Sequence, residues 1–258
     1  MAKRHRLLVV GNWKMNPRTL KEAEKLFLEV QKGVKSGEVI IAPPFPFISD
    51  LHLLSRMKRI KLAAQDIFFD THGAHTGEVS LPMLKSVGVT ASIVGHSERR
   101  ERGESNAEIY KDIQTLIKHR TLAIVCVGEK TRNNDHHGDY FNAVETQLVA
   151  ALKNLKPAEL KYIVVAYEPV WAIGTRNDAT PEDVGEMKLF IRKVLSDRFN
   201  RVAAAKVPIL YGGSVNKENA GALIEKGGVD GFLVGGASLK AKEFLSIIEE
   251  ASYAIART

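Results

Sequence analysis

The stretch Ile163-Val164-Val165-Ala166-Tyr167-Glu168-Pro169-Val170-Trp171-Ala172-Ile173-Gly174-Thr175 indicates most directly how this chain folds. Its first five residues are apolar without alternation, which predicts a strand that is covered on both faces. One carboxylate, Glu168, comes directly after that strand. The residues Val170–Thr175 are largely apolar but fit neither a strand nor a helix, so we expect a loop that covers a site and excludes water. The stretch therefore predicts a buried parallel strand with a functional group at its carboxyl end.

Seven further apolar runs repeat this pattern along the chain, with helix-length segments between them. Lys21–Val34, for example, keeps apolar residues at helical spacing, and Thr180 precedes Pro181 as a cap precedes a first helical turn. The seven runs are Leu7–Val10, Val39–Ala42, Ile60–Ala64, Ala91–Val94, Leu122–Val127, Val207–Tyr211 and Gly231–Val234.

Eight strands that alternate with helices leave two architectures, a closed (β/α)8 barrel or an open doubly wound sheet. An open sheet that binds a dinucleotide would have Gly-x-Gly-x-x-Gly after its first strand, and Gly11–Asn16 lacks that motif. No linker or low-complexity tract divides the chain. We therefore predict an α/β fold, a closed barrel of eight parallel strands each followed by a helix, as a single domain over residues 1–258.

The composition excludes several other classes of protein. Hydrophobic residues make up 45% and charged residues 26% of the chain, as in ordinary globular proteins. No apolar run approaches the roughly 18 residues that would span a bilayer, so we expect no membrane partner. The net charge of +7 raises nucleic-acid binding as an alternative. However, the basic residues are mostly scattered and no aromatic-rich basic stripe accompanies them, so we expect no nucleic-acid partner. A small anionic substrate would suit this charge.

Cysteine usage bears on the compartment. Cys126 is the single cysteine, so an internal disulfide is impossible and a reducing environment is suitable. The apolar run Leu7–Val10 is too short for the core of an export signal. We expect a cytoplasmic protein in which Cys126 is a core residue.

Functional groups follow several of the predicted strands. In a closed barrel the active site lies at the carboxyl ends of the strands. A base candidate, an imidazole, a cation and two glycine-rich turns therefore meet at one face. Each of these groups alone is weak evidence for an active site, because a strand-end Glu is more often an ion-pair partner and a lone His is usually structural. Together they predict an active site. The groups are Asn12, Lys14, His96, Glu168, Gly212-Gly213-Ser214 and Gly235-Gly236.

Five segments, in order from the first strand to the last helix, resemble the triosephosphate isomerase family. They are Gly11–Asn16, Val94–Arg100, Ala166–Thr175, Tyr211–Val215 and Gly235–Leu239. The resemblance implies a TIM barrel and an intramolecular oxidoreductase, an aldose–ketose isomerase of glycolysis and gluconeogenesis. Such an enzyme interconverts D-glyceraldehyde 3-phosphate and dihydroxyacetone phosphate through an enediolate, with neither cofactor nor metal.

The resemblance also implies the catalytic roles. Glu168 would be the base that moves a proton between adjacent carbons, and His96 a neutral donor to the substrate oxygens. Ser97–Arg100 supports the second role, because it predicts a helix start whose positive end disfavours an imidazolium at His96. Lys14 would be the fixed cation and Asn12 a second donor, and both would also bind substrate.

Other residues are implied in binding and support. The backbone N–H groups that bind the phosphate would come from Gly174, Ser214, Gly235 and Gly236. The supporting residues would be Ser97, Glu98 and Cys126. An acid such as Glu98 at a helix start can equally be without catalytic duty. Arg176 stands where the family usually has glycine, and Asp66 where it usually has asparagine.

The segment Gly73–Glu78 resembles the family loop that reaches into a neighbouring subunit. Thr76 would approach Asn12 and Lys14 of the partner subunit, which implies a homodimer. A merely local turn remains an alternative, because a glycine-rich loop needs no partner.

Two other functions stay open. Another sugar-phosphate isomerase on the same barrel would carry its acid and base at different strand ends and would lack Asn12-x-Lys14. A non-catalytic barrel, which binds phosphometabolites or acts as an adhesin, would not need Glu168, His96 and Lys14 together.

Overall fold

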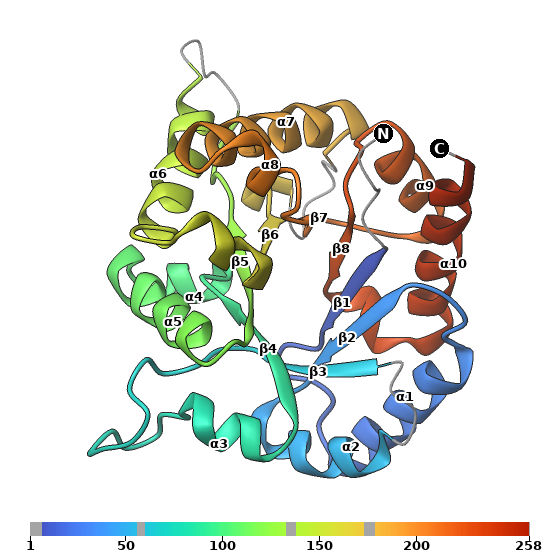
Figure 1. The fold of residues 1–258 in the computed structure, drawn as a ribbon. Coiled ribbons are helices and arrows are strands. Elements are labelled where there is room, and N and C mark those ends of the chain that lie inside the picture. The colour runs from blue at the N-terminus through green and yellow to red at the C-terminus, as the bar shows by residue number, and fades with distance from the viewer. Residues whose placement is uncertain (1–6, 56–59, 133–137, 173–178, 258) are drawn as a thin grey trace.

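A computed structural model of the chain has eight parallel strands in a closed barrel, with helices arranged around it (Figure 1). The structure describes residues 7–55, 60–132, 138–172 and 179–257. Each strand pairs with its neighbours in sequence, and β8 (Gly231–Val234) pairs with β1 (Leu8–Asn12) to close the ring. The predicted (β/α)8 barrel is confirmed, and the open doubly wound sheet is not formed.

All eight predicted apolar runs contain strands, with small differences at the ends. β1 continues to Asn12, because Gly11 and Asn12 pair with Ile41 and Ala42. β7 begins only at Ile209, since the preceding Pro208 has no N–H to donate to a neighbouring strand. The other strands are β2 (Glu38–Ala42), β3 (Ile60–Ala64), β4 (Val89–Val94), β5 (Leu122–Val127), β6 (Ile163–Tyr167) and β7 (Ile209–Tyr211).

The cap that the sequence predicts at Thr180 is confirmed, and Thr19 caps another helix in the same way. The Thr19 hydroxyl accepts the Glu22 N–H before α1, and the Thr180 hydroxyl accepts the Asp183 N–H before α7. In the described residues the α-helices are α1 (Leu20–Gly33), α2 (Ile48–Leu54), α3 (Leu81–Ser86), α4 (Ser97–Glu101), α5 (Asn106–Lys118), α6 (Asp139–Ala151), α7 (Pro181–Arg198), α8 (Arg201–Ala204), α9 (Lys217–Glu225) and α10 (Ala241–Arg257). Short 3-10 turns are η1 (Phe45–Phe47), η2 (Pro157–Tyr162), η3 (Val170–Ala172) and η4 (Gly236–Leu239).

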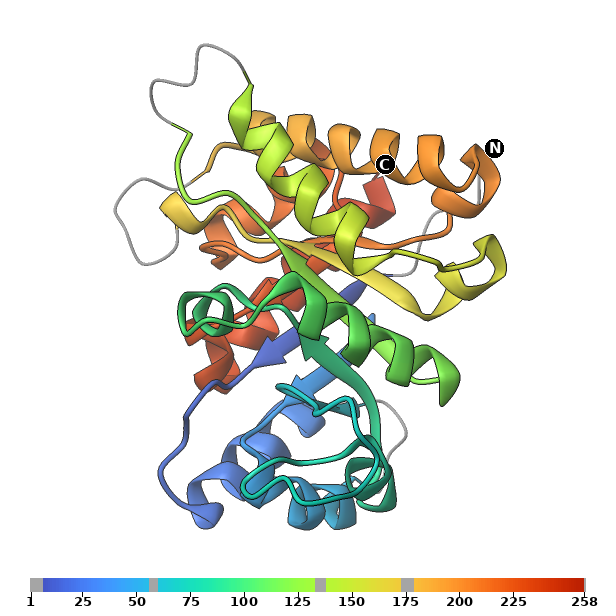
Figure 2. The same cartoon turned by 90° about the vertical axis from the view of Figure 1, so that its left-hand side faces the viewer.

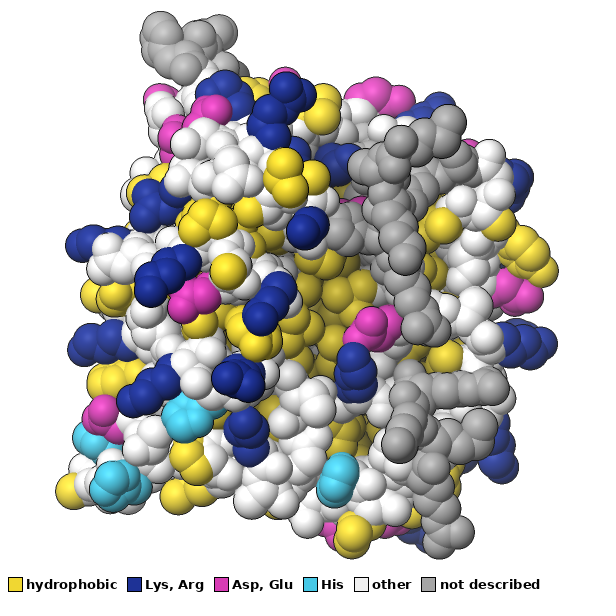
Figure 3. Space-filling model, viewed as in Figure 1, with side chains coloured by type: hydrophobic (Ala, Val, Ile, Leu, Met, Phe, Trp, Pro, Cys, Tyr) yellow, Lys and Arg dark blue, Asp and Glu magenta, His cyan; other side chains and the backbone are white. Residues whose placement is uncertain are grey.

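The helices form an outer layer, in which α5, α6 and α7 pack in sequence along the outside of the barrel (Figure 2). Within the described ranges, no helix combines the length and the apolar character that crossing a bilayer requires. On the face seen in Figure 3, Lys and Arg side chains are interspersed with apolar and other polar groups and form no continuous stripe.

The strands separate two cores, because alternate residues of a strand point to opposite faces. One core lies between the strands and the helices. The other fills the barrel and consists of Leu8, Val10, Ile40, Ala42, Ala63, Ala91, Ile93, Ile124, Cys126, Val164, Ala166, Leu210 and Leu233. Since side chains fill the interior, only the strand ends and the loops after them can hold a ligand.

Candidate active site

A cavity of about 360 Å³ lies at the carboxyl ends of the strands. Its size falls in the usual range for small-molecule sites. Nine of the residues that the sequence predicts for the site line it, and they lie at the carboxyl ends of five different strands. These residues are Asn12, Lys14, His96, Glu168, Gly212, Gly213, Ser214, Gly235 and Gly236.

Glu168 follows β6 and is only 2% exposed. Its backbone N–H donates to the Val127 carbonyl at 2.8 Å, which continues the pairing of β6 with β5 past the strand end. Gly128 makes this close approach possible, because a Cβ at that position would lie 1.7 Å from the Glu168 carbonyl oxygen. The Glu168 carboxylate accepts the Ser97 N–H at Oε2 over 3.0 Å and contacts His96 Nε2 at 3.1 Å through Oε1.

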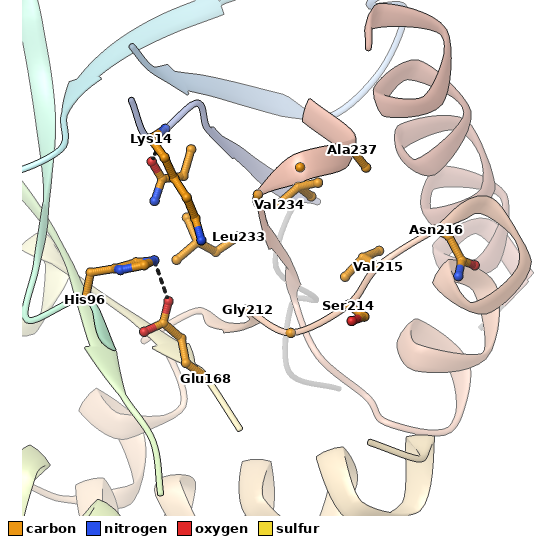
Figure 4. Close-up of a pocket in the computed structure, with 14 residues that line it drawn as sticks. Lys14, His96, Glu168, Gly212, Ser214, Val215, Asn216, Leu233, Val234 and Ala237 are labelled. Atoms are coloured by element: carbon orange, nitrogen blue, oxygen red, sulfur yellow. Dashed lines mark hydrogen bonds and ion pairs between the residues drawn. The ribbon is translucent and has the colours of Figure 1, made fainter. Parts of the chain in front are cut away.

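His96 is the N-cap of the short helix α4. Its Nδ1 accepts the backbone N–H of Glu98 at 3.2 Å. An accepting Nδ1 carries no proton, so the proton of a neutral ring is at Nε2, which faces Glu168 (Figure 4). The helix start that the sequence predicts is confirmed, and it fixes the tautomer in the form that can donate at Nε2.

Lys14 extends toward the His96–Glu168 pair (Figure 4). Its Nζ forms a 2.6 Å ion pair with Glu98 Oε1, and its backbone N–H donates to Asn12 Oδ1 at 3.0 Å. Burial tends to raise the pKa of Glu98, but the hydrogen bond and charge of Lys14 lower that pKa overall. Glu98 therefore contacts the cation directly and helps to hold it at the site.

Gln65 is a supporting residue that sequence reasoning did not identify. Its amide donates to the carbonyls of Lys14 at 2.8 Å and Ala42 at 2.9 Å. It thereby joins the loops after β1, β2 and β3. The available signal was its place directly after the β3 strand, where a polar side chain at a barrel strand end faces the site.

Ser97 and Cys126 both contact Glu168. Ser97 is buried and supplies its backbone N–H to Glu168. Cys126 is fully buried inside the barrel, as expected for a core residue. Burial, and then the charge of Glu168, raise the pKa of the Cys126 thiol well above its ordinary value. The thiol stays protonated and is therefore a packing group rather than a nucleophile.

Two glycine-rich turns line the opposite side of the cavity (Figure 4). Within the described residues, the backbone N–H groups of Ser214, Gly235 and Gly236 donate no hydrogen bond to the protein. Backbone N–H groups at such turns, next to helix starts such as that of α9, are suited to an anion.

The expected covering loop begins at η3, and its start is anchored by Glu129. The Glu129 carboxylate accepts the Trp171 indole N–H at 2.7 Å and the Tyr167 hydroxyl at 2.8 Å. The Val170 N–H donates to the Glu129 carbonyl at 3.0 Å. Sequence reasoning assigned Glu129 no role, although it directly follows Gly128 at the end of β5. Gly174, and with it Thr175 and Arg176, lies outside the described residues.

Thr76 is exposed and lies away from the cavity of its own chain. The segment around it, between β3 and α3, projects from the barrel at the lower left of Figure 1. The residues from His72 to Glu78 are all exposed.

Comparison with known proteins gives a consistent result along almost the whole chain. A sequence model of the family described as "Triosephosphate isomerase" matches residues 7–251. A protein named triosephosphate isomerase from Dictyoglomus thermophilum is 40% identical over 248 residues, which covers 95% of this chain and 99% of that protein. Proteins of the same name from Citrifermentans bemidjiense and Moorella thermoacetica are each 42% identical, over 93% and 94% of this chain and 97% and 98% of their own lengths.

Proposed function

Because the chain belongs to the triosephosphate isomerase family, we propose that it interconverts D-glyceraldehyde 3-phosphate and dihydroxyacetone phosphate, as a step of glycolysis and gluconeogenesis. One observation carries the proposal for this site. Glu168 and the Nε2 of His96 face each other in a cavity that Lys14 also lines. A base, a hydrogen-bond donor and a cation are the three groups that this isomerisation needs.

Glu168 is the proposed base. The reaction takes a proton from the carbon next to a carbonyl and returns it to the adjacent carbon, so one carboxylate beside both carbons can perform both transfers. This family is itself a standard example of such chemistry. The Glu168 side chain is almost completely buried, and a base in such a place is shielded from bulk water.

His96, Lys14 and Asn12 are the proposed stabilisers of the enediolate. Negative charge develops on the substrate oxygens as the proton leaves, and donors that are already in place lower the barrier. The Nε2–H of His96 supplies a hydrogen bond from a neutral imidazole, which is a much weaker acid than an imidazolium. Lys14 supplies the positive charge, held by Glu98 at 2.6 Å, and Asn12 completes the set.

The phosphate is proposed to bind the glycine-rich turns. The N–H groups of Ser214, Gly235 and Gly236 can donate to its oxygens. Gly174 is proposed to add a further N–H from the covering loop. An enediolate that stays next to water can lose its phosphate, so closure of that loop would protect the intermediate. The proposed reaction requires neither a cofactor nor a metal at the catalytic centre.

The assembly is proposed to be a homodimer. The support is the projecting loop around Thr76, which is exposed throughout, and the 92% exposure of Met15 next to Lys14. Thr76 would approach Asn12 and Lys14 of the partner subunit. We also propose a cytoplasmic location, with which a single buried thiol is compatible, and no nucleic-acid or membrane partner.

The non-catalytic alternative has no support, since every group that the chemistry needs is present in the cavity. A coupled assay of the purified chain in both directions tests the proposal. We expect rapid turnover of the two triose phosphates and little turnover of pentose or hexose phosphates, because the cavity is small. Absence of triose phosphate turnover, or a preference for the larger sugars, would contradict it.

A further inference from the structure

Three carboxyl groups outside the catalytic cavity converge on one point. Asp66 follows β3, Glu104 lies in the turn between α4 and α5, and Asp112 lies on α5. One carboxylate oxygen from each can be chosen so that all three lie within 4.8 Å of one another. Three elements that are separate in sequence thus bring their acids together.

Arg99 neutralises only part of this cluster. Its Nη2 contacts Asp66 Oδ2 at 2.6 Å, and its Nε contacts Glu104 Oε1 at 3.0 Å. The second oxygen of each carboxylate, Asp66 Oδ1 and Glu104 Oε2, is buried and has no hydrogen-bond partner among the described residues.

Asp112 is the most informative member. It is 3% exposed and shares the buried face of α5 with Ile109, Ile113 and Leu116. In the described part of the chain its carboxylate forms no ion pair or hydrogen bond, and its Oδ1 is fully buried. An ionised carboxylate in such surroundings is strongly unfavourable without a counter-charge. A third unsatisfied oxygen therefore belongs to the same cluster.

Among the residues that the structure describes, those around the cluster carry more acidic than basic side chains. Glu78 and Glu108 line the adjacent hollow together with Glu104 and Asp112. The other nearby cations, Arg102 and Lys111, are exposed.

The pKa values of the two aspartates agree with this charge imbalance. Burial raises the pKa of Asp66 to about 7 although the charge of Arg99 lowers it, and burial, then the charges of Asp66 and Glu104, raise the pKa of Asp112 to about 8. A counter-charge at the three free oxygens would remove the imbalance.

We propose that the converging carboxylates of Asp66, Glu104 and Asp112, each of which has one buried oxygen without a partner among the described residues, bind a hard divalent cation such as Ca²⁺. Carboxylate oxygens are the ligands that such ions prefer. Oxygens that lie within 4.8 Å of one another are close enough to share one ion, since Ca²⁺ holds its oxygen ligands at about 2.3–2.6 Å. The hollow beside the cluster, about 260 Å³ in volume, gives the ion access and leaves space for water ligands.

The proposed ion would join the loop after β3, the turn after α4 and the middle of α5. Gln65, next to Asp66, holds the Lys14 carbonyl, so the cation would stabilise this side of the barrel. The ion would take no part in the isomerisation. Failure to bind an ion would therefore leave the proposed isomerase function unaffected.

The test is an equilibrium titration of the chelator-treated, full-length protein with Mn²⁺, in which the electron paramagnetic resonance signal reports the free ion. Ca²⁺ is then added as a competitor. The key variant is Asp112→Asn, because it removes a ligand charge without disturbing either contact of Arg99. The matched control is Glu249→Gln, which removes the same charge from an exposed position on α10.

We expect one Mn²⁺ per chain, displaced by Ca²⁺, in both the wild type and Glu249→Gln. Asp112→Asn should weaken the affinity by about tenfold or more, since even indirect partners of a metal ligand contribute that much. If Asp112→Asn does not fold, Asp66→Asn replaces it. A wild type that binds no ion at millimolar concentration, as expected if the oxygens share protons instead, would overturn the proposal. So would binding that is unchanged in the folded aspartate variant.

Discussion

Lys14 has a backbone conformation that few lysines adopt, with φ at +51°. A side chain in this left-handed region costs about 1–2 kcal/mol, and such strain is concentrated at functional positions. The hydrogen bond from its N–H to Asn12 and the contact of its carbonyl with Gln65 offset the cost. The protein thus holds the cation beside the cavity at some expense in stability, which supports a catalytic rather than a structural role.

Replacing Lys14 tests this role. We expect Lys14→Met to lower kcat/KM by about 10- to 100-fold, since a hydrogen bond to a charged group contributes about 1.5–3 kcal/mol. Steady-state kinetics with each triose phosphate provide the measurement. Lys25→Met, at an exposed position on α1, is the control for loss of one positive charge. Equal kcat/KM in the two variants would show that Lys14 contributes only surface charge.

Glu129 carries a prediction about pH. Burial raises the pKa of Glu129 above its ordinary value of 4.5, despite the hydrogen bonds from Trp171 and Tyr167. A raised carboxyl pKa means that the folded state resists ionisation. Glu129 therefore makes its full contribution to the free energy of unfolding below about pH 4.5. This contribution is lost as the pH rises through the pKa of Glu129 in the folded state.

Glu129→Gln should remove this pH-dependent loss of stability, because glutamine does not ionise. The amide oxygen can still accept the two hydrogen bonds, and its NH₂ group would replace the buried Oε2, which has no partner in the described residues. We expect the free energy of unfolding of the wild type, relative to Glu129→Gln, to decrease between pH 5 and pH 8. Urea unfolding of both proteins at equal concentration measures it. A constant difference across this range would mean that Glu129 titrates normally.

At the scale of elements, barrel closure depends on one glycine. Gly231 begins β8 with φ at +151°, and a Cβ there would lie 1.8 Å from the Leu8 carbonyl oxygen of β1. We expect Gly231→Ala to reduce the free energy of unfolding by more than about 1 kcal/mol, because the native conformation is incompatible with a side chain.

Gly221→Ala is the matched control for Gly231→Ala. Gly221 lies inside α9, and a Cβ there meets no atom within 4 Å. Alanine should therefore stabilise that helix by about 0.5–1 kcal/mol. Urea unfolding of the two variants and the wild type measures both effects. If Gly231→Ala is as stable as the wild type, the contact at the β8–β1 junction is not as close as described.

The sequence predicts the elements well and their partners less well. Apolar runs without alternation are sufficient to locate all eight strands, because each is covered on both faces. Their ends depend on pairing, as in the extension of β1 to Asn12 beside Ala42. Strand-end position likewise predicts Lys14, His96 and Glu168.

Strand-end position indicates that Gln65 and Glu129 lie near the site, but it does not predict their roles. Their hydrogen-bond partners are distant in the sequence, and only the closed barrel brings them together. The cluster of Asp66, Glu104 and Asp112 was missed for the same reason. Residues that are adjacent along the chain can be identified from the sequence, whereas residues that meet only in the folded interior cannot.

At the scale of the whole molecule, the dimer can be tested by sedimentation equilibrium. We expect two chains per particle in the wild type. Met15→Asp should shift the equilibrium toward single chains, because it would place a charge in a buried interface. Val202→Asp, at a position 71% exposed on α8, is the control and should remain a dimer. A monomeric wild type, or a dimer equally stable in both variants, would contradict the proposed interface.

The proposed isomerisation depends on Glu168, which is proposed to carry the proton between the two carbons of a triose phosphate. The most direct test is kcat/KM of Glu168→Gln against the wild type in the coupled assay, with circular dichroism to establish that both are folded. The substitution preserves the shape of the side chain and removes its basicity. We predict a loss of roughly 10²-fold or more, the scale of a missing general base. Near-normal turnover in folded Glu168→Gln would show that Glu168 is not the base.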